Sequence, residues 1–140
     1  MEKHIYIFGN GNLSFSDFEQ YYLSVIRQEA SDPATSFLIG DFRGTDTLAM
    51  ELLKNLTPRV TVLHIGERPR YFPDKFRTNA GNWSVRGGFQ SDTERDEFAI
   101  AHCTHFIAVD FNSDSQRTSG TLRNMHACLN AGKTNLTQKG

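Results

Sequence analysis

Four short apolar runs constrain the fold of this chain most strongly. They cover residues 4–8, 36–40, 59–65 and 104–109, and each is apolar nearly throughout. Such runs are typical of strands that are buried on both faces of a parallel sheet. Segments with apolar residues at helical spacing lie between them, so strands and helices alternate along the chain. The sequence therefore predicts an α/β protein whose mainly parallel sheet has helices on both faces.

Helix signals stand between these runs. Two capping boxes of the form Ser-x-x-Glu begin at Ser16 and Ser91, and Thr45 can cap the helix between them. A glycine follows the last helical segment, where it can act as a C-cap. We expect helices over residues 16–31, 45–57, 91–103 and 121–131.

The order of the strands predicts where a ligand would bind. Consecutive pairing through right-handed crossovers gives the order 3-2-1-4 for the four runs, and residues 135–137 can add a short fifth strand at an edge. The chain then forms a Rossmann-like three-layer α/β/α fold of about four strands. Ligands of open α/β sheets bind in the crevice where the strand order reverses, here between strands 1 and 4. The loops 9–12 and 110–121 flank that crevice, and the loop 40–46 is next to them.

These loops have the composition of a phosphate site. Glycines allow the backbone to approach a ligand closely, and the free N–H groups in the first turn of a helix favour an anion. Arginines on the loops can add charge. The residues that we expect to bind the ligand are Gly9, Asn10, Gly40, Asp41, Arg43, Gly44, Thr45, Arg95, Asp110, Arg117, Ser119, Gly120 and Thr121.

Composition limits the partners of the chain. Its 140 residues suffice for a single domain, 1–140, and its net charge of −1 gives no general attraction to nucleic acid. No apolar run approaches the roughly 20 residues of a membrane helix, and no targeting signal is visible, so we expect a cytoplasmic protein. We also expect self-association, most simply as a homodimer, to cover an apolar sheet edge or helix face.

No metal site is expected. Cys103 and Cys128 have apolar neighbours, as buried reduced thiols do, and the five histidines do not stand at zinc-ligand spacing. No motif assigns a cofactor, because the dinucleotide fingerprint and the Walker A lysine loop are both absent. A nucleotide or NAD-derived ligand is the small molecule that we expect.

Residues 66–90 interrupt the alternation of strands and helices. The segment holds prolines, glycines, five arginine or lysine residues and several aromatic side chains. A long irregular loop in a compact domain is often functional. We expect a functional loop here, in which Trp83 and Phe89 stack a base while arginines meet phosphates. The alternative is a loop whose aromatic residues cover the edge of the sheet.

Three motifs resemble one superfamily. The segment GDFRGTDTLA at residues 40–49 resembles a motif of the SLOG superfamily, in particular of its YspA-type branch of small proteins. Gly87-Gly88-Phe89 with Ser91 and Arg95-Asp96, and the later Ser119-Gly120-Thr121, are similar to further motifs of that branch. The superfamily includes DNA-processing protein A and the Lonely Guy phosphoribohydrolases, and nucleoside 2-deoxyribosyltransferases have a similar layout. The resemblance implies binding of a nucleotide-derived ligand, with the Gly-Thr loop on the phosphate.

One departure from that pattern bears on catalysis. The glycosidase members carry a catalytic Glu within one turn after Gly-Thr, where this chain has Arg123 and Asn124. Asp41, Asp96 and Asp110 are weaker candidates for a catalytic carboxylate, and each also has a structural or ribose-binding interpretation.

Binding of a nucleotide or of a derivative such as ADP-ribose is therefore the leading hypothesis. An N-glycosidase or deoxyribosyltransferase-like enzyme that acts on nucleoside phosphates is the alternative. A DNA-binding module comes third, because the net charge is −1 and the chain lacks a basic stripe beyond residues 68–86.

Overall fold

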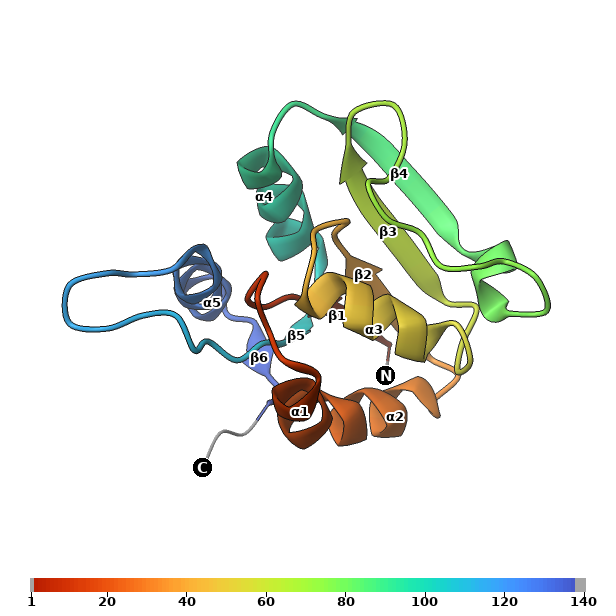
Figure 1. The fold of residues 1–140 in the computed structure, drawn as a ribbon, viewed down its shortest axis with the longest axis horizontal. Helices are drawn as coiled ribbons and strands as arrows, with labels where there is room; N and C mark the ends of the chain where they lie inside the picture. The colour runs from red at the N-terminus through yellow and green to blue at the C-terminus, as the bar shows by residue number, and fades with distance from the viewer. Residues whose placement is uncertain (1, 138–140) are drawn as a thin grey trace.

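The computed structural model describes residues 2–137 and contains one parallel sheet. Its six strands are β1 (Lys3–Ile7), β2 (Thr35–Ile39), β3 (Val60–Ile65), β4 (Ser84–Phe89), β5 (His105–Ile107) and β6 (Thr134–Asn135). They lie in the order β4-β3-β2-β1-β5-β6, and each pair is parallel (Figure 1). The predicted order 3-2-1-4 is confirmed as β3-β2-β1-β5. The strand order reverses at β1, as the alternation of strands and helices implied.

The prediction missed β4 and placed β6 slightly too late in the chain. Residues 66–90 are not one loop, because they include the 3₁₀ helix η2 (Asn79–Asn82) and β4, which extends the sheet beyond β3. β6 overlaps the expected 135–137 segment only at Asn135. Thr137 lies just beyond it and its hydroxyl accepts a hydrogen bond from the Ala108 N–H at 3.0 Å.

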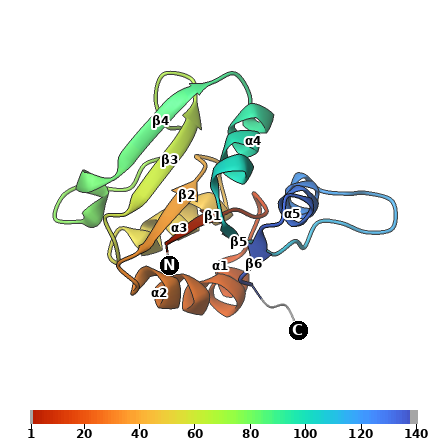
Figure 2. The ribbon, with the colours of Figure 1, turned by 180° about the vertical axis from the view of Figure 1, so that it is seen from behind.

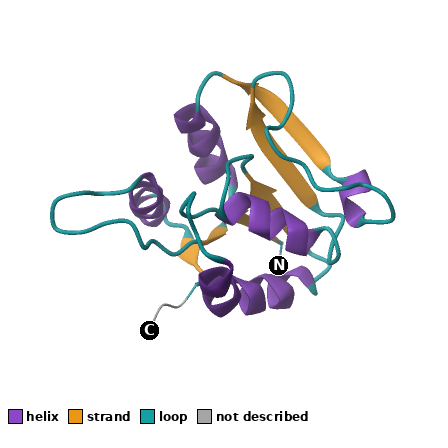
Figure 3. Cartoon of the chain, viewed as in Figure 1, coloured by secondary structure: helices purple, strands orange, loops and turns teal. Residues whose placement is uncertain are grey.

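Helices cover both faces of the sheet (Figures 1 and 2). The first is continuous from α1 (Phe15–Phe18) through a π-helical turn, η1 (Glu19–Leu23), into α2 (Ser24–Ala30). Together with α3 (Thr45–Leu53) it packs on one face, and α4 (Asp92–His102) and α5 (Gly120–Asn130) pack on the other. Figure 3 shows the same layers by type of secondary structure.

Alternation along the central strands creates the two cores. Ile5 and Ile7 of β1 face α1–α3, whereas Tyr6 and the following Phe8 face α4 and α5. All four side chains are at most 5% exposed. This is the pattern of a strand buried on both faces, as the continuous apolar run predicted.

The helix starts partly differ from the predictions. Ser91 caps α4 as expected, with its hydroxyl accepting the Glu94 N–H at 3.1 Å. The cap of α1 is Ser14, not Ser16, because Ser14 Oγ accepts the Asp17 N–H at 3.1 Å. Gly44 rather than Thr45 stands at the N-cap of α3, with a φ of 75°.

The stacking role predicted for Trp83 and Phe89 is not supported. Trp83 is 8% exposed in the core, and its indole N–H donates to the Thr57 carbonyl at 2.9 Å. Phe89 packs against Phe98 of α4 with ring centroids 5.2 Å apart. Across residues 2–137, the structure has no helix long and apolar enough to cross a membrane.

Candidate functional site

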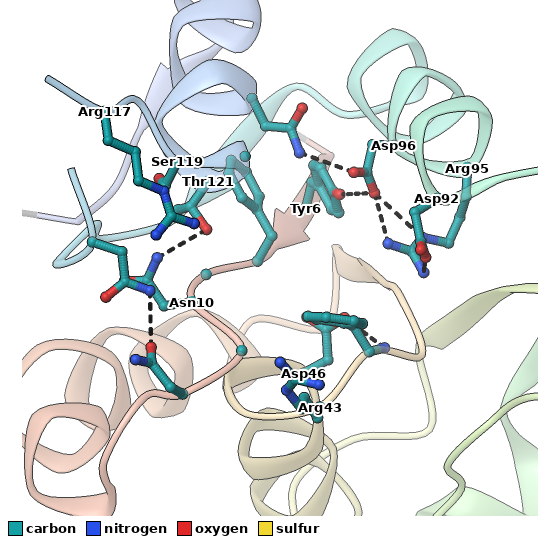
Figure 4. Close-up of a pocket in the computed structure, with 18 residues that line it drawn as sticks. Tyr6, Asn10, Arg43, Asp46, Asp92, Arg95, Asp96, Arg117, Ser119 and Thr121 are labelled. Atoms are coloured by element: carbon teal, nitrogen blue, oxygen red, sulfur yellow. Dashed lines mark hydrogen bonds and ion pairs between the residues drawn. The ribbon is translucent and has the colours of Figure 1, made fainter.

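A cavity of about 550 Å³ lies where the strand order reverses. Its walls come from the end of β1, from the loops after β1, β2 and β5, and from the N-terminal ends of α3, α4 and α5. Figure 4 shows Arg117, Ser119 and Thr121 on one side, Asp92, Arg95 and Asp96 on the opposite side, and Asp46 with Arg43 below. The lining residues are Tyr6, Phe8, Gly9, Asn10, Gly11, Asn12, Phe42, Arg43, Asp46, Asp92, Arg95, Asp96, Asn112, Arg117, Ser119, Gly120, Thr121 and Asn124.

The start of α5 forms one side of the cavity. Ser119 caps this helix, because its hydroxyl accepts the Leu122 N–H at 3.0 Å and donates to Asp110 Oδ1 at 2.7 Å. Gly120 and Thr121 follow in the first turn, where backbone N–H groups have no acceptor inside the helix. Arg117 precedes the cap on the loop that extends beside α5 (Figure 1). This side therefore favours an anion.

Asn10 joins three loops that are distant in the sequence. Its carbonyl accepts the Thr45 N–H at 3.2 Å and the Thr45 hydroxyl at 3.0 Å. Its side-chain amide donates to Asp110 at 2.9 Å and accepts the Phe111 N–H at 2.8 Å. Asn10 is only 3% exposed, so these bonds are shielded from water. The backbone carbonyl and the side chain of Asn10 together fix the relative positions of the loops after β1, β2 and β5.

Asp110 is held ionised by the same contacts. Burial works against its charge, but hydrogen bonds from Ser113, Asn10 and Ser119 lower the pKa of Asp110 to about 2. The carboxylate does not line the cavity, since it lies behind Asn10 and Ser119. The geometry therefore assigns Asp110 to ordering the loops.

A buried arginine organises the opposite side. Arg95, 5% exposed, makes ion pairs at 2.7 to 2.9 Å with Asp41, Asp92 and Asp96. Asp41 also receives hydrogen bonds from the Arg70 backbone at 2.9 Å and from two of its guanidinium nitrogens at 3.1 and 2.8 Å. Burial opposes ionisation of Asp41, yet the bonds from Arg70 lower its pKa.

Asp96 faces the cavity but is already bonded on both oxygens. Its Oδ1 accepts from the Tyr6 hydroxyl at 3.0 Å and from Arg95, and its Oδ2 accepts from the Asn124 amide at 3.0 Å. Burial raises the pKa of Tyr6 well above its ordinary value, and the nearby Asp96 carboxylate adds to this effect. Asn124 is one of the two residues at the positions where the resemblance implies a Glu. Here its amide holds Asp96 in place.

Asp46 is the carboxyl group of the cavity with the fewest bonds. Its Oδ2 accepts the Phe42 N–H at 3.0 Å, and Asp46 is 6% exposed. Burial raises the pKa of Asp46 to about 7, while Arg95 and the Phe42 N–H oppose the shift only in part. At neutral pH the acid form and the ionised form of Asp46 are therefore both populated.

The structure brings many of the predicted residues together. Those that line the cavity are Gly9, Asn10, Arg43, Arg95, Asp96, Arg117, Ser119, Gly120 and Thr121. Those that do not line it are Gly40, Asp41, Gly44, Thr45 and Asp110, which pack behind the wall. Asp41 instead borders a second, smaller hollow with Arg70.

Several lining residues were not among those predicted. Tyr6 and Phe8 point toward the cavity because they occupy the α4/α5 face of β1 and its extension. The alternation of the strand could have indicated this face. Asp46 lies in the segment GDFRGTD, one residue into a helix, where an acidic residue usually only complements the helix dipole. Its burial depends on α4 and could not be read from the sequence.

No group of three or more histidine, cysteine or acidic side chains within residues 2–137 could hold a metal ion. The free thiols Cys103 and Cys128 are buried.

Comparisons with known proteins identify the fold. The structure is similar to DNA-processing protein A from Helicobacter pylori, studied for its single-stranded DNA binding mode, with a TM-score of 0.67 and 14% identity over 95% of this chain and 63% of that one. It is also similar to the molybdenum cofactor carrier protein of Chlamydomonas reinhardtii, with a TM-score of 0.61 and 17% identity over 96% and 75%. The chain thus spans less than two thirds of the first of these structures.

No protein-family model matches the sequence, and no curated protein matches it either. The two structural similarities show a Rossmann-like α/β/α fold. The YspA-type branch stays a prediction.

Proposed function

We propose that this chain binds a nucleotide or a nucleotide-derived ligand, such as a mononucleotide, ADP-ribose or a fragment of NAD. One observation carries the proposal: the N-terminus of the 11-residue helix α5, Arg43 and Arg117 line the same cavity. A helix N-terminus and two arginines are donors that suit phosphate oxygens. Ser119, Gly120 and Thr121 would contact the phosphate in this arrangement.

The rest of the cavity suits the organic part of such a ligand. Its volume of about 550 Å³ falls in the range of small-molecule sites, roughly 300–1,000 Å³. The rings of Tyr6, Phe8 and Phe42 form apolar parts of its wall, against which a flat base can pack. Arg43 lies over the Phe42 ring at 5.2 Å, so both can contact one ligand.

A thermal-shift screen tests the proposal. The probes are inorganic phosphate, AMP, CMP, ADP-ribose and NAD, and we expect at least one organic phosphate to raise the melting temperature more than inorganic phosphate does. Gly120→Asp should abolish the shift, because it places a negative charge at the start of α5. Gly81→Asp is the matched control: both glycines are exposed, and a Cβ at either would meet its nearest atom at 3.5 Å. Absence of any shift with all probes would refute the proposal.

One observation supports a second candidate, cleavage or transfer at the N-glycosidic bond of a nucleoside phosphate. Asp96 and Asp110 are bonded to neighbouring groups, and Asp41 lies off the cavity, but Asp46 combines burial in the wall with a pKa raised to about 7. A carboxyl group with such a pKa suits proton transfer at neutral pH. Chromatography for free base after incubation with nucleoside monophosphates tests this candidate, and Asp46→Asn should abolish any release of base.

Single-stranded DNA is the third ligand to compare. The similarity to DNA-processing protein A raises this option, whereas the net charge of −1 favours a small ligand. Fluorescence anisotropy with a labelled oligonucleotide at low salt distinguishes the two, and we expect no binding that survives addition of 200 mM salt.

A further inference from the structure

Asp46 lines the cavity, and one of its carboxyl oxygens has no hydrogen-bond partner in the described part of the chain. Its Oδ2 accepts the Phe42 N–H at 3.0 Å, whereas its Oδ1 has no hydrogen-bond partner among residues 2–137. The residue is 6% exposed and lines the cavity, so its free oxygen can meet only what enters there. Asp46 Oδ1 is not one of the fully buried unpartnered atoms of residues 2–137, so it is open to the cavity, where a polar group of a ligand can bond it.

The Phe42 N–H also decides which oxygen carries a proton. Oδ2 must accept the Phe42 N–H bond, so a proton on the carboxyl group resides on Oδ1. Gly40 leaves room for this arrangement, because a Cβ there would lie 3.0 Å from Asp46 Oδ2 and 3.1 Å from the Arg95 guanidinium. In its acid form, Asp46 therefore presents one O–H donor to the cavity.

The surroundings disfavour a negative charge on Asp46. The nearby cation Arg95 is already paired with three carboxylates, and adjacent anions add repulsion. A ligand phosphate would bring further negative charge into the same cavity and would displace water, and both effects favour the neutral acid. The titratable and charged groups that face Asp46 are Tyr6 of β1, Tyr22 of η1, Asp41 and Arg43 of the loop before α3, and Arg95 and Asp96 of α4.

We propose that Asp46 is a neutral hydrogen-bond donor in the complex, recognising an uncharged acceptor of the phosphorylated ligand, so that binding takes up a proton. This inference rests on the proposed function. The acceptor is a ring nitrogen or a carbonyl oxygen of a base, such as those of adenine, cytosine or nicotinamide. A ligand that offers only N–H donors at this point would need the ionised carboxylate and would bind less well.

Isothermal titration calorimetry between pH 6 and pH 9 tests the inference. ADP-ribose is the first probe, because its diphosphate bridge does not titrate near neutral pH. We expect the affinity to fall above pH 7, approaching tenfold per pH unit, and titrations in two buffers of different ionisation enthalpy to show proton uptake. If a mononucleotide raises the melting temperature more than ADP-ribose does, the mononucleotide becomes the probe. Its phosphate titrates near neutral pH in the same way with wild type and with Asp46→Asn. The difference in proton uptake between the two proteins therefore reports Asp46 alone.

Substitutions separate a neutral donor from a carboxylate. Asp46→Asn keeps an acceptor for the Phe42 N–H and offers an N–H donor, so it should bind as wild type does at pH 6 and about a hundredfold more tightly at pH 9. Asp46→Ala should bind more weakly than Asp46→Asn at every pH. Asp74→Asn is the matched control, because exposed Asp74 also accepts a backbone N–H, from Phe76 at 2.9 Å, but lies outside the cavity. It should retain the pH dependence of wild type.

The outcomes distinguish the two proposals. Ligand binding without proton uptake, or a folded Asp46→Asn variant that no longer binds, would overturn the role of Asp46 and leave the proposed function standing. No binding of any probe at any pH would overturn the proposed function itself.

Discussion

At Gly44 the loop before α3 packs tightly against the loop after β1, and replacing this glycine with alanine tests that packing directly. Its φ is 75°, and a Cβ there would lie 2.5 Å from the carbonyl carbon and oxygen of Gly11 and 2.6 Å from the Asn10 oxygen. Gly66 is a matched control, because its φ is 74° and a Cβ there would meet no atom within 4 Å. Both substitutions place an alanine at a positive φ, but only the alanine at Gly44 also collides with neighbouring backbone atoms.

The structure allows the difference in unfolding free energy between the two variants to be estimated. A positive φ costs an alanine at least about 1–2 kcal/mol. At Gly44 the loops must also separate, which breaks the two bonds from Thr45 to the Asn10 carbonyl, worth about 1 kcal/mol each. Displacing packed backbone adds about 1–3 kcal/mol. We therefore expect Gly44→Ala to lower the free energy of unfolding by about 3–5 kcal/mol more than Gly66→Ala.

Urea denaturation measures both values, with fluorescence of the single buried Trp83 as the signal. Gly44→Ala should also abolish ligand-induced thermal shifts, while Gly66→Ala should leave them intact. Equal losses of stability for the two variants would show that the loops after β1 and β2 do not pack as described.

Three further predictions concern other contacts. Burial raises the pKa of Asp46 to about 7, so the folded state binds the proton of this group more tightly than the unfolded state does. The free energy of unfolding should therefore fall as the pH rises from about 4 through 7. Asp46→Asn should thus stabilise the protein at pH 8 by up to about 4 kcal/mol and little at pH 4, as urea denaturation at both pH values would reveal. Ser14→Ala should cost about 1 kcal/mol and Ser16→Ala close to zero, because only Ser14 caps α1; equal effects would contradict this assignment. Trp83→Phe should lower the melting temperature without changing ligand affinity, since its indole N–H bonds the Thr57 carbonyl in the core; a loss of affinity alone would restore a role in base stacking.

The central strands could be predicted because a strand buried on both faces has a continuous apolar run in its own sequence. The runs containing Ile5, Phe37, Val62 and Ile107 are apolar whichever way each side chain points, and their order follows from consecutive pairing. β4 lacks such an apolar run, because it is an edge strand with mostly exposed side chains. Its Gly87 suits a close approach by the His64 ring of β3, which only the assembled sheet reveals.

The loops of the site could be predicted, but the roles of individual side chains could not. Topology alone places the loops after β1, β2 and β5 at one edge of the sheet, so Ser119 and Gly120 could be expected to line the same cavity. Whether Asp41 or Asp46 faces the cavity depends on Arg70 and Arg95, which approach from segments distant in the sequence. Long-range ion pairs of this kind leave no periodic pattern in the chain.

The bonds of Asn10 have a consequence for the energetics of binding. Loops that form a ligand site are commonly mobile, and a ligand must then offset the entropy of ordering them. Here one buried amide connects the loops after β1 and β5, and its backbone carbonyl connects them to α3. That ordering is completed when the protein folds, so a ligand of the proposed kind would meet a preorganised wall and would retain more of its contact energy as affinity.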